Sequence, residues 1–376
     1  MVYVGAEENA HDILDRLGKI RAELKAEYLE PHSRPWIVGF SGGKDSTLVL
    51  QLVFEMLLEL PPSRRTRPVH VLSNDTRVES PVVQNFIDGV LDHIAEGVES
   101  LRIPVTVRKT TPDLEGTFWV NLIGRGYPAP NRLFRWCTDR LKIRPTTEYI
   151  QKQVGASGEV ILLLGVRRLE SSQRAKTMQR YDNGTRLNPH NNVKGCLVFR
   201  PIVELSTDEV WTALLQMLPP WGGTHRALAT LYRNAQGGEC PFVVDQDDAP
   251  SCGTSSSRFG CWTCTVVEKD KSMLGFIDSG FEHLEPLVDF RDWLQVYSRD
   301  PSNRMTERRN GAPGLGPFTM DARRTILAEL RKTETEVSLS LISDAELRRV
   351  EEIWTEDKAN MLFRQADRIF STLEET

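Results

Sequence analysis

The sequence predicts an α/β fold: a parallel sheet with flanking helices, followed by a mostly helical C-terminal extension that carries a cysteine-rich loop. Three observations support this fold class. Strand-sized apolar segments alternate with amphipathic helices over about residues 30–230. Residues 159–167 are apolar almost throughout, as expected of a strand buried on both faces. Near residue 234 the chain becomes rich in Gly, Ser, Asp and Cys and loses any sustained period, so this segment needs a ligand or metal to order it.

The individual elements follow from local signals. Ser80 is the expected N-cap of one helix, directly before a proline. Ser206 with Glu209, and Ser343 with Glu346, have capping-box spacing, which predicts a helix start at each pair. An N-terminal helix is expected over about residues 8–29, and strands are expected over residues 36–40, 69–75, 103–110, 159–167 and 195–203.

Length and composition limit the domain organisation and the class of protein. At 376 residues the chain is long for one compact core. We therefore predict an N-terminal helix (1–29), a nucleotide domain (30–230) and a cysteine-rich, helical region (231–376). Hydrophobic content of 40% and charged content of 26% are ordinary for a globular protein.

Several bulk features exclude other classes. No apolar run approaches the length of a membrane span, and the acidic, amphipathic N-terminus lacks the order of a secretion signal, so a cytoplasmic protein without a membrane partner is expected. A net charge of −5 argues against a uniformly basic nucleic-acid binder, although local basic patches can still bind DNA. Six cysteines in such a chain favour metal binding or thiol chemistry over disulfides.

The most specific motif is a glycine loop between a predicted strand and a predicted helix. Residues 36–47 read WIVGFSGGKDST, which does not match G-x-x-x-x-G-K-[ST] and is therefore not the loop of kinases and motor ATPases. Gly42 and Gly43 let the backbone approach an anion, and the free amides of a helix start favour negative charge there. Ser41, Ser46 and Thr47 add hydroxyls, and Lys44 adds a positive charge. The alternative is a simple glycine turn with a serine cap.

Four cysteines are candidate ligands of a metal or cluster. Cys261 and Cys264 form a C-x-x-C pair, Cys252 lies nine residues before it, and Cys137 lies far upstream. One close pair with two scattered cysteines suits a [4Fe–4S] cluster, while zinc, a redox-active pair or unligated thiols are the alternatives. Cys240 competes with Cys252 as the fourth ligand, or is a free thiol that carries sulfur.

Polar residues follow the second and fourth predicted strands, where open α/β sheets bind ligands. After the second strand come Asp75, Thr76 and Glu79, positioned to read an adenine edge; for Glu79 a polar turn that caps the next helix is the alternative. After the fourth strand come further candidates, with arginines suited to bidentate phosphate contact: Gly165, Arg167, Glu170, Ser171 and Arg174.

Two arginine-rich segments are candidate phosphate-contact surfaces, with a solvated charge run as the alternative for each. The segment 299–309 contains four arginines. The segment around Cys137 has only one acid, Asp139, against five basic residues: Arg132, Arg135, Arg140, Lys142 and Arg144.

These motifs together resemble a known family. SGGKDST resembles the loop of the PP-loop ATP pyrophosphatases (adenine nucleotide alpha hydrolase-like proteins), which split ATP into AMP and pyrophosphate. The order of SGGKDST, NDTRVESP, WCTDRLK, GVRRLESSQR, FRPIVELSTDEVW and GCWTC is similar to the 3′-phosphoadenylylsulfate reductase-like branch, and within it to the DndC/SspD family of DNA phosphorothioation sulfurtransferases. The resemblance covers about residues 30–290.

The resemblance implies an activity, cofactors and partners. ATP would activate a non-bridging oxygen of the DNA backbone, and sulfur from a cysteine desulfurase would then replace that oxygen, with other phosphorothioation proteins handling the DNA. It implies a [4Fe–4S] cluster on Cys137, Cys252, Cys261 and Cys264. The chain has no cysteine after residue 264 and no adjacent Cys-Cys pair, so sulfonucleotide reduction is not expected. The alternatives are a PP-loop tRNA thiolase with a cluster and a non-enzymatic scaffold.

The expected chemistry assigns a role to each site residue. Positioning and charge stabilisation dominate such a step, with Mg²⁺ bridging the phosphates. Lys44 would hold pyrophosphate, Arg167 or Arg174 the α-phosphate, and Asp45 either the metal or a hydrogen bond that organises the loop. The expected ATP contacts are Ser41, Gly42, Gly43, Lys44, Asp45, Ser46, Asp75, Thr76 and Gly165.

Overall fold

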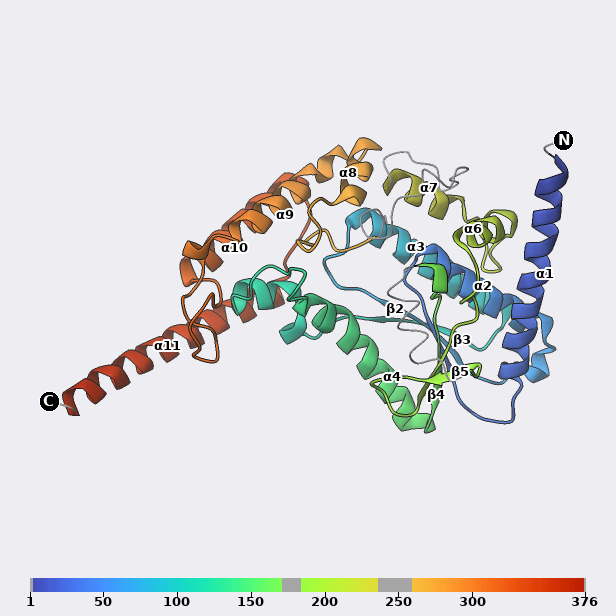
Figure 1. The fold of residues 1–376 in the computed structure, drawn as a ribbon, viewed down its shortest axis with the longest axis horizontal. Helices are drawn as coiled ribbons and strands as arrows, with labels where there is room; N and C mark the ends of the chain where they lie inside the picture. The colour runs from blue at the N-terminus through green and yellow to red at the C-terminus, as the bar shows by residue number, and fades with distance from the viewer. Residues whose placement is uncertain (1–2, 171–183, 236–258, 375–376) are drawn as a thin grey trace. The chain divides into compact units, whose positions relative to one another are not determined.

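The structure is a computed structural model that describes residues 3–170, 184–235 and 259–374. One sheet of six strands has the order β3-β2-β1-β4-β6-β5. Figure 1 shows the strands of this sheet as arrows within the fold. All pairings are parallel except that of β5 with β6. The predicted fold class is confirmed. The strands are β1 (Trp36–Gly39), β2 (Val69–Asn74), β3 (Val105–Thr110), β4 (Val160–Leu163), β5 (Leu187–Pro189) and β6 (Cys196–Phe199).

The five predicted strands are all present, and β5 is the strand that sequence analysis missed. It has three residues, one of them proline, and no apolar alternation. Its pairing with β6 joins Leu187 to Phe199 and Pro189 to Leu197. A strand this short is recognisable only by its partner, because its own residues carry no strand signal.

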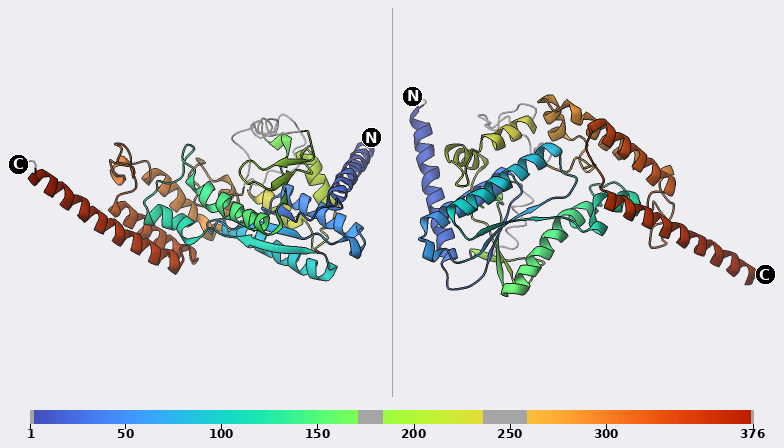
Figure 2. Two further views of the ribbon diagram at one scale, coloured as in Figure 1. Left: turned by 90° about the horizontal axis from the view of Figure 1, so that it is seen from below. Right: turned by 180° about the vertical axis from the view of Figure 1, so that it is seen from behind.

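Helices flank the sheet and form the C-terminal region. Figure 2 shows α1 and α2 side by side, and α6 packs against both. The described helices are α1 (Tyr3–Tyr28), α2 (Lys44–Glu59), α3 (Pro81–Leu101), α4 (Arg144–Ser157), α6 (Thr207–Gln216), α7 (Arg226–Ala235), α8 (Lys271–Asp278), α9 (Glu285–Tyr297), α10 (Met320–Val337) and α11 (Asp344–Glu374).

The helix caps match the sequence signals in part. Both capping boxes are present: Ser206 with Glu209, and Ser343 with Glu346. Ser80 occupies the predicted N-cap position of α3. Its hydroxyl is buried and has no hydrogen-bond partner among the described residues, so it does not cap the helix.

The chain forms two compact units that interleave in sequence. Unit 1 consists of residues 1–75, 80–110 and 145–259, and contains the sheet. Unit 2 consists of residues 76–79, 111–144 and 260–376. The predicted sequence boundaries at 29 and 230 describe contiguous segments, whereas the units are assembled by contacts between distant segments.

The core of unit 1 follows from the apolar residues of the central strand and its helix. Trp36, Ile37 and Val38 of β1 are fully buried, as are most apolar residues of α2. This burial explains why the loop between them is held in place, since both of its ends continue into fixed elements.

His225 makes the stability of unit 1 sensitive to acid. Its buried ring donates from Nε2 to Gln51 Oε1 at 2.5 Å, and burial lowers the pKa of His225 to about 4. In the unfolded chain the pKa is about 6.5, so between these values only the unfolded state gains the proton. The stabilisation is complete above pH 6.5. It falls as pH drops toward 4, by up to about 3 kcal/mol from this group.

Urea unfolding at pH 7 and pH 5 tests this expectation. His225→Gln should flatten the difference in unfolding free energy between the two pH values. An unchanged difference in the variant would show that other groups control the acid sensitivity.

Unit 2 is built around buried tryptophans and an arginine. Trp119 Nε1 donates to Leu341 O at 2.6 Å, and Trp354 Nε1 donates to Ile123 O at 3.0 Å. Arg323, which is 3% exposed, donates to Gly124 O at 2.8 Å. These bonds fasten the turn at residues 120–124 to α10 and α11. No helix among the described residues is both long and apolar enough to cross a membrane.

Candidate functional site

The glycine loop lies at the point where the order of the sheet reverses. β1 has β2 on one side and β4 on the other, so successive connections run in opposite directions from it. The loop at residues 41–43 follows β1, and residues 164–167 follow β4. The carboxyl ends of two such strands form the usual ligand crevice of a doubly wound sheet.

The backbone of the loop is organised for an anion. Gly42 has φ +73°, and a Cβ there would come within 2.5 Å of Ile87, so only glycine fits. The hydroxyls of Ser46 and Thr47 donate to Gly43 O at 2.9 Å each. Among the described residues, the amides of Gly42, Gly43, Asp45 and Ser46 have no protein acceptor, which leaves them open to an anion.

Asp45, in the first turn of α2, forms ionic contacts with Arg167 and Lys44. Arg167 is 1% exposed and donates from Nε to Asp45 Oδ1 at 2.5 Å. It also donates to Leu205 O at 3.3 Å and to Thr207 Oγ1 at 3.1 Å. Lys44 Nζ lies 3.0 Å from Asp45 Oδ2. Asp45 thus contacts both cations, and Lys44 remains at the start of the helix.

Gly165 lets β4 approach the helix start. A Cβ on Gly165 would lie 2.6 Å from the carbonyl group of Asp45 and 2.7 Å from Ser46 N. These are backbone atoms and cannot rotate away, so any side chain at position 165 displaces the loop.

Gly165→Ala should therefore reduce ATP use by the loop. We expect kcat/KM for pyrophosphate release to fall by about 10- to 100-fold, because overpacking strain of 1–3 kcal/mol moves the open amides. Gly155→Ala on α4 is the matched control, since its Cβ meets no atom within 4 Å. That control should be neutral or stabilising by up to about 1 kcal/mol. Equal rates in both variants would contradict this role of Gly165.

Tyr232 of α7 is a site residue that sequence analysis missed. Its hydroxyl accepts from Lys44 N at 3.3 Å, and Lys44 Nζ lies 5.5 Å from the ring centroid. Trp211 and Phe259 pack edge-on against the same ring, at 5.0 and 4.6 Å between centroids. No sequence signal marks this tyrosine, because it occupies the apolar face of an ordinary amphipathic helix.

The other predicted site residues lie in different units or outside the described residues. Asp75 follows β2, donates its amide to Thr110 O at 2.9 Å, and lies 3.7 Å from Lys109 Nζ. Thr76 and Glu79, predicted beside adenine, belong to unit 2. Arg174, Ser171, Cys252 and Cys240 lie outside the described residues, as does the side chain of Glu170.

Unit 2 contains a second group of candidate site residues, in which the segment 76–79 pairs with the C-x-x-C turn. Glu79 and Cys261 form an antiparallel bridge, and Trp262 N donates to Val78 O at 3.0 Å. Thr76 Oγ1 lies 3.4 Å from Cys261 Sγ and 3.1 Å from Glu79 Oε1. Two of the polar residues after β2, Thr76 and Glu79, therefore contact a thiol.

Cys137, another cysteine of unit 2, lies directly before a π-helical turn. Cys137 precedes the turn Thr138–Ile143, which carries Lys142. Lys142 Nζ lies 3.1 Å from Glu79 Oε1, and Glu79 Oε1 lies 3.8 Å from Cys261 Sγ. Burial would lower the pKa of Lys142, but the negative charges of Cys261 and Glu79 outweigh burial and raise it. Lys142 is thus a cation held among acidic and thiol groups.

Electrostatic interactions involve Cys137, Cys261 and Cys264, three of the four described cysteines. Burial raises the pKa of Cys261, Glu79 raises it further, and Lys142 opposes the shift. Burial also raises the pKa of Cys137, and the charge of Cys264 adds to this. Cys264 N donates to Cys261 O at 3.0 Å, which closes the C-x-x-C turn.

These thiols suit an iron–sulfur cluster by their chemistry, because cysteine thiolates are the usual ligands of such clusters. The charge of Cys264 contributes to the pKa shifts of both Cys137 and Cys261, whereas Cys252, the fourth predicted ligand, lies outside the described chain. In the part of the chain that is described, no three His, Cys, Asp or Glu side chains are already arranged around a metal position. Cys196 is 2% exposed and packs within the apolar core of the sheet in unit 1, whereas Cys137, Cys261 and Cys264 belong to unit 2.

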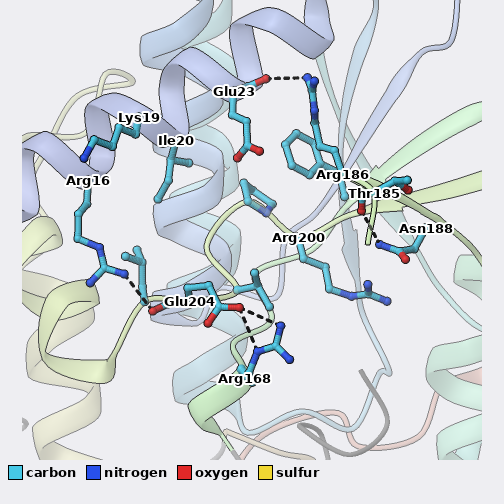
Figure 3. Close-up of a pocket in the computed structure, with 14 residues that line it drawn as sticks. Arg16, Lys19, Ile20, Glu23, Arg168, Thr185, Arg186, Asn188, Arg200 and Glu204 are labelled. Carbon is cyan, nitrogen blue, oxygen red and sulfur yellow. Dashed lines mark hydrogen bonds and ion pairs between the residues drawn. The ribbon is translucent and has the colours of Figure 1, made fainter. Parts of the chain in front are cut away.

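A cavity of about 380 Å³ in unit 1 contains none of the predicted site residues. It lies between α1, residues 185–188 and residues 199–205. Figure 3 shows Arg16 and Arg168 reaching Glu204, at 3.2 and 3.0 Å, and Arg186 reaching Glu23 O at 3.3 Å. Its charged groups fasten α1 to the edge of the sheet, so we assign the cavity no ligand.

The fold and the glycine loop define a PP-loop protein: an α/β sheet whose anion-binding loop follows its first strand at the topological switch point. A family model of the phosphoadenosine phosphosulfate reductase domain matches residues 35–267, more than half of the chain, and the chain belongs to this family. Members of this family are enzymes that act on nucleotides or sulfur compounds.

The individual proteins that are similar to this chain have sequence identities of 28% or less. An uncharacterized protein of Methanocaldococcus jannaschii is 28% identical over 193 residues, which cover 51% of this chain and 34% of that protein. The chain therefore spans about a third of that relative's length. A phosphoadenylyl-sulfate reductase from Candida auris is 12% identical over 51% of this chain and 82% of its own, with a TM-score of 0.29. The U34-tRNA thiolase NcsA from Methanococcus maripaludis, with its [4Fe–4S] cluster, is 16% identical over 53% and 62%, with a TM-score of 0.34.

Proposed function

We propose that this protein is an ATP pyrophosphatase and sulfurtransferase that modifies the DNA backbone. It uses ATP to attach AMP to a non-bridging phosphate oxygen, and sulfur then replaces that oxygen. The observation that carries the proposal is the glycine loop, where open amides and Lys44 lie at the ligand crevice, beside the ion pair of Asp45 with the buried Arg167. The order of the sequence motifs supports DNA as the acceptor.

The first chemical step forms a bond between a DNA phosphate oxygen and the α-phosphorus of ATP. The bond from the α-phosphorus to the bridging oxygen breaks, and pyrophosphate leaves with its electron pair. Lys44 and the amides of the loop would stabilise the charge on that leaving group. Arg167 is already occupied by Asp45, Leu205 and Thr207, so its role is to position the loop rather than to touch phosphate.

The second step replaces AMP by sulfur. A persulfide from a cysteine desulfurase attacks the DNA phosphorus, and AMP leaves with the original oxygen. A thiol then reduces the new S–S bond by two electrons, which leaves a phosphorothioate and a disulfide. Cys137, Cys261 and Cys264, with Cys252, would hold a [4Fe–4S] cluster, which supplies soft sulfur ligation when bound. Thr76, Glu79 and Lys142 would position the Cys261 side of that site.

Mass spectrometry of nuclease-digested DNA tests the proposal. Cells with the gene should contain phosphorothioate dinucleotides, and cells without it should lack them. Restoring the gene should restore the modification, whereas restoring Lys44→Ala should not. Phosphorothioate levels unaffected by the deletion would refute DNA as the acceptor. Loss of thionucleosides from tRNA in the same cells would instead support the tRNA thiolase alternative.

A further inference from the structure

Unit 2 exposes an apolar loop tip between two arginines. Leu133 is 98% exposed and Phe134 is 44% exposed, and both neighbours, Arg132 and Arg135, are exposed as well. Single exposed apolar residues are common and need no explanation. Two adjacent large apolar side chains at one tip, flanked on both sides by guanidinium groups, indicate a surface that contacts something anionic and partly apolar.

The tip has a defined conformation. Asn131 Oδ1 accepts from Leu133 N at 2.9 Å and from Phe134 N at 3.0 Å. The main chains of Asn131 and Phe134 also bond in both directions, at 3.2 and 3.3 Å. The apolar side chains are therefore presented by a closed turn, which lowers the entropy cost of binding.

An aromatic and cationic platform supports the tip. The ring of Tyr127 lies 6.3 Å from that of Phe134 and 5.5 Å from that of Trp136. The guanidinium groups of Arg140 and Arg309 each lie 5.4 Å from the centroid of Tyr127. Arg309 also donates to Arg125 O at 2.6 Å.

Two arginine-rich segments thus meet on one tyrosine. Residues 127–136 contain no acidic residue, and Asp139, the next one along the chain, is paired with Arg144 at 2.7 Å. A local excess of positive charge on a chain of net charge −5 is what a polyanion would recognise.

We propose that this basic–apolar surface, made of residues 131–135 with Tyr127, Arg140 and Arg309, binds duplex DNA. The arginines bind backbone phosphates, and Leu133 and Phe134 insert as an apolar wedge against base edges in the minor groove. The inference rests on the proposed function and adds the surface that holds the substrate. Cys137 follows Arg135 by two residues, so DNA at the tip lies beside the thiol cluster of the same unit.

Fluorescence anisotropy with labelled duplex DNA over a range of salt concentrations tests the proposal. The variant Arg132→Ala/Arg135→Ala should weaken binding by about tenfold or more and reduce the slope of log K against log salt by about 2, because two phosphate contacts are lost. The variant Leu133→Ser/Phe134→Ala should weaken binding with the slope unchanged. The matched control, Arg64→Ala/Leu218→Ser, changes an exposed arginine and an exposed leucine of unit 1 and should bind like the unmodified protein.

Further readouts separate this surface from the proposed function. Thermal stability and iron content should be the same in all these proteins. If tip variants bind DNA normally while the gene still directs phosphorothioation, the surface assignment is wrong and the function stands. If the tip binds duplex DNA but deletion leaves DNA sulfur unchanged, the surface stands and the function is wrong. Tip variants that lose only a sulfur-donor protein, or that show a preference for RNA, would overturn the surface assignment.

Discussion

Lys44→Ala should lower kcat for pyrophosphate release by on the order of 100-fold or more, with little loss of folding stability. A cation positioned beside the departing pyrophosphate acts mainly in the transition state, where such groups contribute several kcal/mol. The remaining network stays intact, since Asp45 keeps its 2.5 Å bond to Arg167. A coupled enzymatic assay of pyrophosphate with ATP and duplex DNA measures the rate, and calorimetry measures the stability.

The contrast with Arg167 makes the assignment specific. Arg167→Ala should lose activity together with about 3–5 kcal/mol of stability, because it leaves the Asp45 carboxylate without its buried partner. Arg167→Lys should rescue little, since an ammonium cannot reach Asp45, Leu205 and Thr207 in one planar geometry. Lys152→Ala, on the exposed face of α4, is the control for charge loss. A Lys44→Ala protein that is fully active would refute the ATP site.

Replacement of Cys261 should abolish the iron and acid-labile sulfide of anaerobically purified protein, and with them sulfur transfer. Thiolates are the ligands of such clusters, and serine at this position binds iron poorly. Cys137→Ser and Cys264→Ser should have the same effect, because both residues are predicted thiolate ligands of the same cluster. Elemental analysis and visible absorption measure cluster content, and phosphorothioate yield measures transfer.

Cys196→Ala is the matched control for these variants. Burial raises the pKa of Cys196 to about 11, and its neighbours in the sheet are apolar, so it should behave as a core side chain. Its iron content should be normal, with at most a modest loss of stability. Pyrophosphate release should survive in the Cys261 variant, because the glycine loop belongs to unit 1. Purified unmodified protein without iron would refute the cluster.

Local signals in the sequence predicted much of the fold. The glycine loop, the capping boxes at Ser206 and Ser343, and five strands follow from hydrogen bonding and periodicity within short windows. β5 was missed because three residues with a proline are a strand only beside β6. The hydroxyl of Ser80 does not cap α3 although its position was predicted, since local spacing does not determine side-chain direction.

The candidate sites also combine features that follow from the local sequence with features that depend on tertiary contacts. The sequence by itself determined the conformation of the glycine loop, because Gly42 and the helix start act through backbone geometry within a few residues. It also supplied the C-x-x-C turn, whose spacing is local. Its roles for Arg174 and Cys252 stay predictions.

Tertiary structure alone decided which distant residues complete each site. Glu79 bridges to Cys261, although 182 residues separate them in the chain. Tyr232 covers the start of α2, and Arg309 shares Tyr127 with Arg140. Such pairings depend on how complete strands and helices pack, and the free energy of packing belongs to the whole chain rather than to any short segment. Local chemistry therefore specified the glycine loop, while long-range packing gave Cys261 its charged neighbours and the arginines their shared surface.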